Sequence, residues 1–116
     1  MMSKEIKSFG DAIRGLIIFF AKERHAKLHL IIMLLVVLGG FYFKVSGTEW
    51  ILLCIAFALV IGSEALNTAV EKLSDIVQPE KHAGIRDVKD IAAGAVFFCV
   101  IMAVIIGVII FIPKIF

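Results

Sequence analysis

The polar end of a long apolar segment reads Glu64-Ala65-Leu66-Asn67-Thr68-Ala69-Val70-Glu71-Lys72-Leu73-Ser74-Asp75. At about 100° per residue, one face of a helix over this stretch carries only polar side chains, namely Glu64, Asn67, Thr68, Glu71 and Asp75. We call this face the acidic stripe. Its carboxylates repel one another, and placing even one of them in hydrocarbon costs roughly 2.5–3.5 kcal/mol, so the stripe requires a compensating partner. A hard divalent cation is the natural candidate, because such ions prefer oxygen ligands.

The composition is typical of a membrane protein. Of the 116 residues, 61% are hydrophobic and 19% are charged, and the mean hydropathy is +1.04. Three apolar runs, over about 26–43, 50–70 and 91–112, approach the roughly 20 residues that a helix needs to cross a bilayer. Lipid cannot satisfy open backbone groups, so each span should be helical. The sequence therefore predicts an all-α integral membrane protein with a single domain over residues 1–116.

Residues 1–24 place apolar and charged side chains on opposite sides of a helix. This pattern predicts an amphipathic helix that lies on the membrane surface. Glu23 lies where this helix ends and the first span begins. Two interpretations remain open, because the segment is either a plain anchor or a means of bringing a carboxylate to a site. His29, near the start of the first span, is likewise either a capping or interfacial histidine or part of a site.

The basic residues are distributed unevenly along the chain. Of the 12 Lys and Arg residues, six lie at or before Lys27 and four lie from Lys72 to Lys89, which leaves Lys44 and Lys114. By the positive-inside rule, the amino terminus and the loop after the second span face the cytoplasm, in the inner, cytoplasmic membrane of a cell. The net charge of +2 is too small to indicate a nucleic-acid partner, and anionic headgroups are the better match for these residues.

Neither familiar phosphate-binding loop, G-x-x-x-x-G-K-[ST] or G-x-G-x-x-G after a strand, occurs in the chain. Phosphoryl transfer chiefly needs positioned reactants, metal ions on the phosphates and a group that orients or deprotonates the attacking hydroxyl. Glu23 and Glu71 could hold magnesium, which typically takes one or two carboxylates together with waters and phosphates. Glu64 lies deeper in the leaflet, where fewer waters reach it, and is the candidate general base. Lys89 beside Asp90 could supply a phosphate contact and its orientation.

Two other functional classes also fit the acidic stripe. Proton pathways use acids inside spans, which would make the protein a small oligomeric ion-coupled transporter. Alternatively, the stripe is a polar seam that fixes helix register in a structural scaffold. A transporter needs its acid near the middle of the bilayer, whereas the stripe runs outward to the cytoplasm. Lipid phosphorylation by the purified protein would separate a kinase from both.

The acidic stripe and the residues after it resemble a known family. Glu64-x-x-Asn67-x-x-x-Glu71-x-x-x-Asp75 is followed by Glu80-x-His82, and then by Lys89-Asp90 before a span rich in alanine and glycine. This pattern resembles the bacterial diacylglycerol kinase and undecaprenol kinase family of small integral-membrane lipid kinases. The similarity covers nearly the whole chain and includes Gly15 and the Glu23 position. Its most specific part is the helix that carries the two glutamates and the asparagine of the stripe.

The resemblance implies a homotrimer whose protomers each have three spans and an amino-terminal surface helix. It implies that magnesium and ATP are used to phosphorylate the hydroxyl of a membrane lipid at the cytoplasmic interface. By the same resemblance, Glu64 is the catalytic base and Asn67 supports the site. Glu23 and Glu71 would bind the metal together with ATP. The other residues that it implies in contact with ATP are Glu80, His82, Lys89 and Asp90.

Several positions favour the undecaprenol branch of this family over the diacylglycerol branch. The diacylglycerol branch tends to carry an aromatic residue in the surface helix, where this chain has Asp11 and Ile13, so the lipid contacts of those positions do not transfer. His29 replaces an acid of that branch. Similarity to the undecaprenol branch extends over Phe43-Lys44-Val45-Ser46, Glu49-Trp50 and Pro113-Lys114. The resemblance therefore implies undecaprenol as the preferred lipid.

Overall fold

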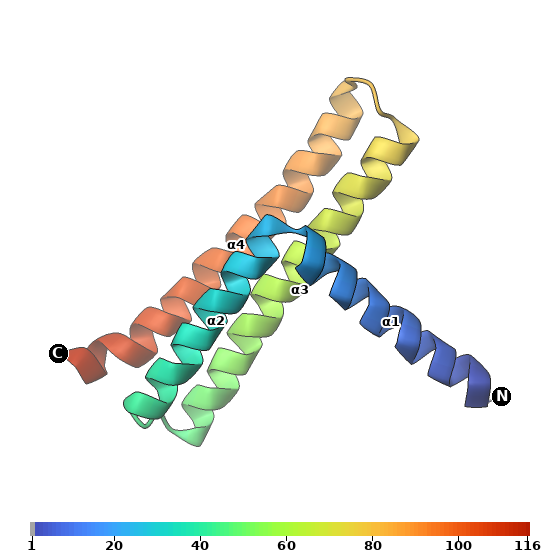
Figure 1. Ribbon diagram of the computed structural model, residues 1–116. Helices are drawn as coiled ribbons and strands as arrows, with labels where there is room; N and C mark the ends of the chain where they lie inside the picture. The colour runs from blue at the N-terminus through green and yellow to red at the C-terminus, as the bar shows by residue number, and fades with distance from the viewer. Residues whose placement is uncertain (1) are drawn as a thin grey trace.

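The computed structural model describes residues 2–116, and helices account for nearly all of them. In chain order they are α1 (Met2–Lys22), α2 (Arg24–Tyr42), α3 (Gly47–Val77) and α4 (Ala83–Ile115). Figure 1 shows α2, α3 and α4 as long rods, with α1 leaving them at an angle. No strand occurs in the described range, so the predicted all-α fold is confirmed. By length and apolar composition, α2, α3 and α4 could each cross a membrane, as predicted.

The first helix has the character of a surface helix. Large apolar side chains remain exposed along much of α1, including Ile6, Phe9, Ile13 and Ile17. Phe19 is buried near the end of the helix, where α1 reaches α2 and α3. An exposed apolar face opposite a charged one is stable when it is embedded at the boundary between lipid headgroups and acyl chains. The predicted amphipathic helix is therefore present.

A single residue separates α1 from α2. Glu23 has extended backbone angles (φ −91°, ψ 123°) at the position that caps α2, but its side chain makes no capping hydrogen bond. The Glu23 amide donates to the Phe19 carbonyl (3.0 Å) and so closes α1. The end of the helix does not use the Glu23 carboxylate, which stays available to a ligand.

Local hydrogen bonds define the turn between α2 and α3. Lys44 adopts the left-handed conformation (φ 54°), and the Val45 amide donates to the Gly40 carbonyl (3.1 Å), a common way of closing a helix. Ser46 then caps α3. The Glu49 amide donates to Ser46 Oγ (3.1 Å), and the Ser46 amide donates to Glu49 Oε1 (2.9 Å). These bonds explain why α3 begins at Gly47, ahead of the apolar run.

The last two helices make most of the contacts between helices. At 1.5 Å per residue, the 31 residues of α3 span about 46 Å and the 33 residues of α4 about 50 Å, so both extend beyond a hydrocarbon core of about 30 Å. Val45, Leu53 and Ile110 form a small buried core at the end near the α2–α3 turn. At the same end, Lys114 Nζ donates to Glu49 Oε2 (2.6 Å). These contacts hold the α2–α3 turn, the start of α3 and the end of α4 together.

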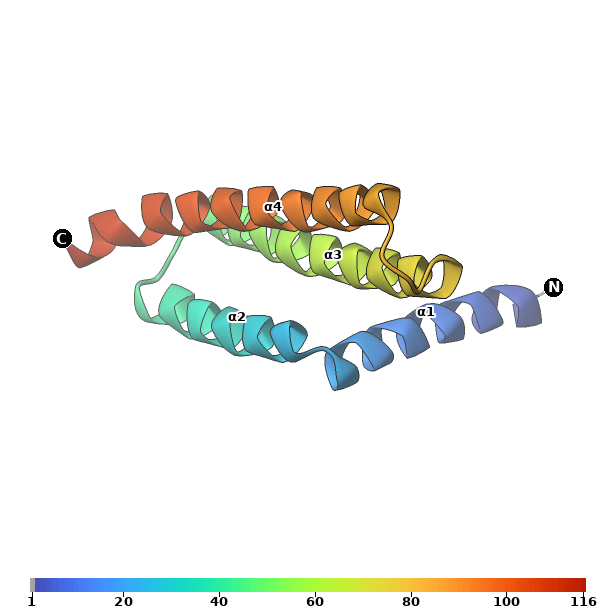
Figure 2. The same ribbon diagram turned by 90° about the horizontal axis from the view of Figure 1, so that it is seen from above.

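The packing is looser around α2. The backbones of α2 and α4 stay apart, as Figure 2 shows, and Phe111 of α4 reaches α2 through its side chain, beside Gly39. Large apolar side chains are exposed on all three spans, for example Leu34, Leu35, Phe97 and Ile109. These faces require lipid or another protein surface, as expected for a membrane protein.

Gly40 of α2 lies tightly against Trp50 of α3. A Cβ at Gly40 would lie 2.5 Å from Trp50 Cη2, whereas a Cβ at Gly39 would meet Phe111 at an ordinary 3.5 Å. Overpacking costs about 1–3 kcal/mol, against about 1 kcal/mol gained when alanine replaces glycine in a helix. We expect Gly40→Ala to lower the Tm in mild detergent, and Gly39→Ala, the matched control, to leave it unchanged or raise it. Equal Tm values for the two variants would contradict the close contact.

Candidate functional site

Four of the predicted site residues line one pocket, where the α1–α2 junction faces α3 and α4. The pocket has a volume of about 400 Å³. The junction contributes Glu23, and α4 contributes Ala93 and Val96. The acidic stripe on α3 contributes Glu64, Asn67, Thr68 and Glu71. The helical period puts these side chains on one face, and the junction between α1 and α2 brings a further carboxylate opposite to them.

Glu64 is the enclosed carboxylate of this pocket. Its side chain is only 12% exposed, whereas Glu71, seven residues further along α3, is exposed. His29 of α2 places Nε2 2.9 Å from Glu64 Oε1, and the His29 side chain is 17% exposed. When Glu64 is ionised, Nε2–H is the donor of this bond. The role of His29, which the sequence left open, therefore includes direct contact with the candidate base.

Asn67 lies between these two glutamates on α3. Its Oδ1 atom is buried and has no hydrogen-bond partner. Since buried polar atoms are nearly always paired, an orphaned oxygen indicates a partner that the isolated chain does not supply. A carboxamide oxygen can accept a hydrogen bond or bind a hard cation. The pocket is therefore suited to such a ligand.

The oxygen donors of the pocket fit a magnesium ion. Glu23 is partly buried, Glu71 is exposed, and both line the pocket with Asn67. No three His, Cys, Asp or Glu side chains within residues 2–116 converge as a complete metal site. Magnesium is usually held by one or two carboxylates while phosphates and waters fill its other positions. The two glutamates and the asparagine oxygen match that partial ligand set.

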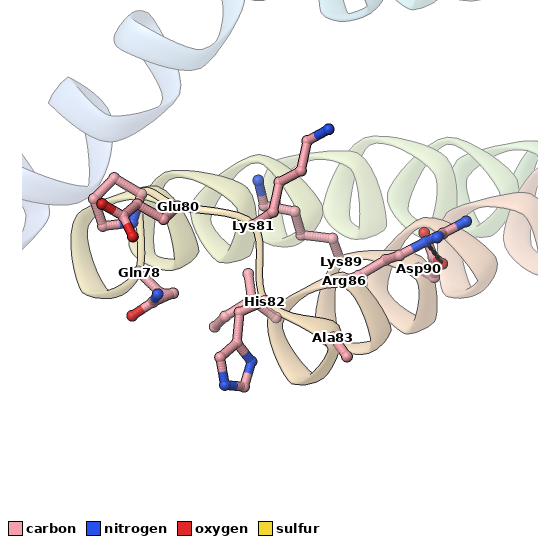
Figure 3. Close-up of a pocket in the computed structure, with 10 residues that line it drawn as sticks. Gln78, Glu80, Lys81, His82, Ala83, Arg86, Lys89 and Asp90 are labelled. Carbon is pink, nitrogen blue, oxygen red and sulfur yellow. Dashed lines mark ion pairs between the residues drawn. The ribbon is translucent and has the colours of Figure 1, made fainter.

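A second pocket, with a volume of about 620 Å³, lies at the connection between α3 and α4. Figure 3 shows its lining residues gathered around the turn and the first turns of α4. The four remaining predicted nucleotide contacts all line it: Glu80, His82, Lys89 and Asp90. The predicted site residues thus fall into two groups within one chain. The first group surrounds Glu64, and the second surrounds the loop.

Contacts within the second pocket assign local roles to three of these residues. His82 Nδ1 accepts a hydrogen bond from the Gly84 amide (3.0 Å) and so caps α4. Lys89 Nζ donates to Asp75 Oδ1 (2.6 Å). Asp90 faces Arg86 instead (3.8 Å). The ammonium group of Lys89 is therefore oriented by the acidic stripe and not by its sequence neighbour, because adjacent residues on a helix point in different directions.

The two pockets share no lining residue, and the Asp75–Lys89 ion pair links the acidic stripe to the second pocket. Asp75, the partner of Lys89, follows Glu71 by one helical turn, or about 6 Å. Basic residues that the sequence did not single out line both pockets, with Arg24 in the first and Arg86 in the second. Two features of the sequence could have pointed to these basic residues. Arg24 directly follows Glu23, and Arg86 lies four residues before Asp90. Each pocket therefore offers both carboxylates and cationic side chains.

His29 also lines an apolar cavity. This cavity, of about 240 Å³, lies among α2, α3 and α4. Met33, one turn after His29, contributes to its wall, as do Ala56 of α3 and Gly107 of α4. His29 therefore contacts a carboxylate of the polar pocket and also lines an apolar cavity.

Comparisons with known proteins identify the family of this chain. The sequence profile of the family described as prokaryotic diacylglycerol kinase matches residues 10–111. An undecaprenol kinase of Bacillus subtilis (strain 168) is 33% identical over 113 residues, which cover 97% of this chain and 92% of the relative. A diacylglycerol kinase of Synechocystis is 33% identical over 101 residues, which cover 86% of this chain and 58% of the relative. With three membrane-length helices and this match along almost its whole length, the chain belongs to the prokaryotic diacylglycerol kinase family of membrane lipid kinases.

Proposed function

We propose that this lipid kinase uses magnesium and ATP to phosphorylate the hydroxyl of undecaprenol in preference to diacylglycerol. The observation that carries the proposal is the pocket in which Glu23, Glu64 and Glu71 face one space, with Asn67 Oδ1 buried and unpaired among them. The relative named undecaprenol kinase, which aligns with 97% of this chain, supports the choice of lipid. Membership in a family of lipid kinases argues against the transporter and the scaffold considered from the sequence.

In this proposal Glu64 is the general base. Its depth in the pocket and its low exposure suit a hydroxyl that is held at the membrane interface by a hydrocarbon chain. The hydroxyl proton passes to the Glu64 carboxylate as the lipid oxygen forms its bond to the γ-phosphorus of ATP. The bond from that phosphorus to the bridging oxygen breaks, and its electron pair leaves with ADP. Through its Oδ1 atom, Asn67 would hold a hydrogen-bond donor or a cation beside the phosphates.

Glu23 and Glu71 are the proposed magnesium ligands, with Asn67 Oδ1 beside them. The ion would neutralise negative charge on the phosphates during transfer. The extended backbone at Glu23 keeps its carboxylate clear of the helix end. The exposure of Glu71 leaves room for waters and phosphate oxygens next to the protein ligand.

The second pocket is the proposed place for the rest of the nucleotide. Lys81, Arg86 and Lys89 supply positive charge there, and Glu80 and Asp90 supply hydrogen-bond acceptors. Lys89 lines this pocket and is held beside Asp75, one helical turn beyond Glu71, so it is the proposed contact for a phosphate chain that extends from one pocket to the other. Because the His82 side chain caps α4, the start of that helix determines where the imidazole lies.

We further propose that the site faces the cytoplasm and that the protein works as a homotrimer. The concentration of Lys and Arg at the amino terminus and near the α3–α4 loop supports the orientation. The exposed apolar faces of the spans support association. A Cβ at Gly94 would meet nothing within 4 Å, so the small residues Ala92, Ala93 and Ala95 around it leave α4 open to a close helix neighbour.

The substrate proposal is tested by assays with undecaprenol and diacylglycerol in matched micelles, with the purified protein and magnesium ATP. We expect the higher kcat/KM with undecaprenol. A clear preference for diacylglycerol would remove the undecaprenol assignment but leave the lipid kinase assignment intact. Turnover of neither lipid, with the protein folded and bound to ATP, would contradict the proposed reaction itself.

A further inference from the structure

A hydrogen bond joins His29 of α2 to the proposed base, Glu64, on α3. His29 Nε2 lies 2.9 Å from Glu64 Oε1, and both side chains are largely enclosed, at 17% and 12% exposure. Two enclosed polar groups that contact each other restrict each other's rotation more than two solvated ones do, because water does not compete for the bond. The orientation of the Glu64 carboxylate is therefore set by a residue on another helix.

The surroundings of His29 explain why this contact is available. The imidazole meets the Glu64 carboxylate of the polar pocket, and His29 also lines the apolar cavity to which Met33 contributes. Elsewhere in the described chain α2 packs loosely against α3, and its backbone does not come close to that of α4. The bond thus joins the loosely packed helix to the catalytic one at the level of Glu64.

We propose that His29 is a positioning residue for Glu64, an inference that rests on the proposed function. The Nε2–H group donates to Oε1 and holds the carboxylate in one rotamer, which leaves Oε2 as the oxygen that receives the lipid hydroxyl proton. His29 keeps its own proton throughout. The O–H bond of the lipid breaks, the proton goes to Oε2, and the phosphoryl step is otherwise the one described above. His29 acts through Glu64 and touches neither ATP nor the metal.

The kinetic test compares two substitutions of His29 in the full-length protein in lipid micelles. His29→Leu removes the donor, whereas the amide of His29→Gln can donate to the same oxygen. A hydrogen bond to a charged group contributes enough that its loss should lower kcat roughly 10–100-fold, with the KM for ATP unchanged. His29→Gln should stay closer to wild type. The matched control is Met33→Leu, which changes the wall of the same apolar cavity and should keep kcat within about twofold of wild type.

A double-mutant cycle separates positioning from general packing. In the Glu64→Gln background, His29→Leu should have much less effect on the residual rate than it has in the wild type, because the proton acceptor that His29 orients is already gone. If the two substitutions multiply instead, or if Met33→Leu is as damaging as His29→Leu, His29 acts through packing and the inference is wrong. Unchanged kcat in His29→Leu would also overturn it.

A spectroscopic readout tests the contact without relying on turnover. In wild-type protein with ¹⁵N-labelled histidine, the His29 ring should show a single tautomer with the proton on Nε2, assigned by its absence from His29→Gln. Glu64→Ala should return the His29 signals towards exchanging tautomers. Identical His29 signals with and without Glu64 would refute the contact. Failure of the wild-type protein to phosphorylate any lipid would instead count against the proposed function, so the two failures are distinguishable.

Discussion

Glu64→Gln is expected to lower kcat by roughly 10²–10⁴-fold, the range typical for loss of a general base. Glutamine keeps the shape of the side chain and can still accept the hydrogen bond from His29 through its carbonyl oxygen, but it cannot take up a proton from the lipid hydroxyl. The interaction that is lost belongs to the transition state, so KM for ATP should change little. Steady-state and single-turnover phosphorylation of undecaprenol in micelles measure this effect.

The control for Glu64→Gln is Glu5→Gln, which removes the same charge from the exposed part of α1, outside both pockets. It should retain wild-type turnover. Normal turnover in Glu64→Gln would identify the acidic stripe as a structural seam. If Glu64→Gln loses ATP affinity while its single-turnover rate at saturating ATP is preserved, Glu64 is a nucleotide ligand and not the base.

Glu71→Gln is expected to weaken binding of magnesium ATP by at least about 10–100-fold. This is the usual loss when a group that supports a metal ligand is removed, and loss of a direct ligand should cost no less. Glu71 is the exposed carboxylate of the pocket, one helical turn from the Asp75–Lys89 pair, where the phosphates would arrive. High magnesium should restore part of the activity. Titrations of ATP at several magnesium concentrations measure the shift.

Asp87→Asn is the matched control for Glu71→Gln. Asp87 is exposed on α4 and lines neither pocket, so its loss should leave the magnesium dependence unchanged. An equal shift in both variants would show a general charge effect and not a metal ligand. Asn67 lies between Glu64 and Glu71 and can couple them, so the double mutant of the two glutamates need not be additive.

The fold class and the polar face could be predicted from the sequence because both depend on local properties. Hydropathy and the helical period follow from neighbouring residues, and they suffice to identify three membrane-length helices and the common face of Glu64, Asn67 and Glu71. The ends of the helices were harder to predict from the sequence. α4 begins at Ala83, well before the apolar run near Ile91, because His82 caps a polar helical segment that hydropathy alone does not reveal.

The roles of single polar residues depended on contacts over long sequence separations. His29 and Glu64 are 35 residues apart, and Asp75 and Lys89 are 14 apart, so neither pair produces a local pattern. The sequence put Lys89 beside Asp90, but on a helix these neighbours diverge, and each side chain bonds to a different group.

The sequence by itself thus determined which apolar segments are helical, which of them can lie in a membrane and which polar groups share a face. Tertiary structure alone decided that the α1–α2 junction brings Glu23 to the acidic stripe, that the loop residues form a pocket of their own, and that His29 meets Glu64. The physical reason is that periodicity describes one helix at a time. A site between helices depends on how each helix ends and on which of its faces packs against the next.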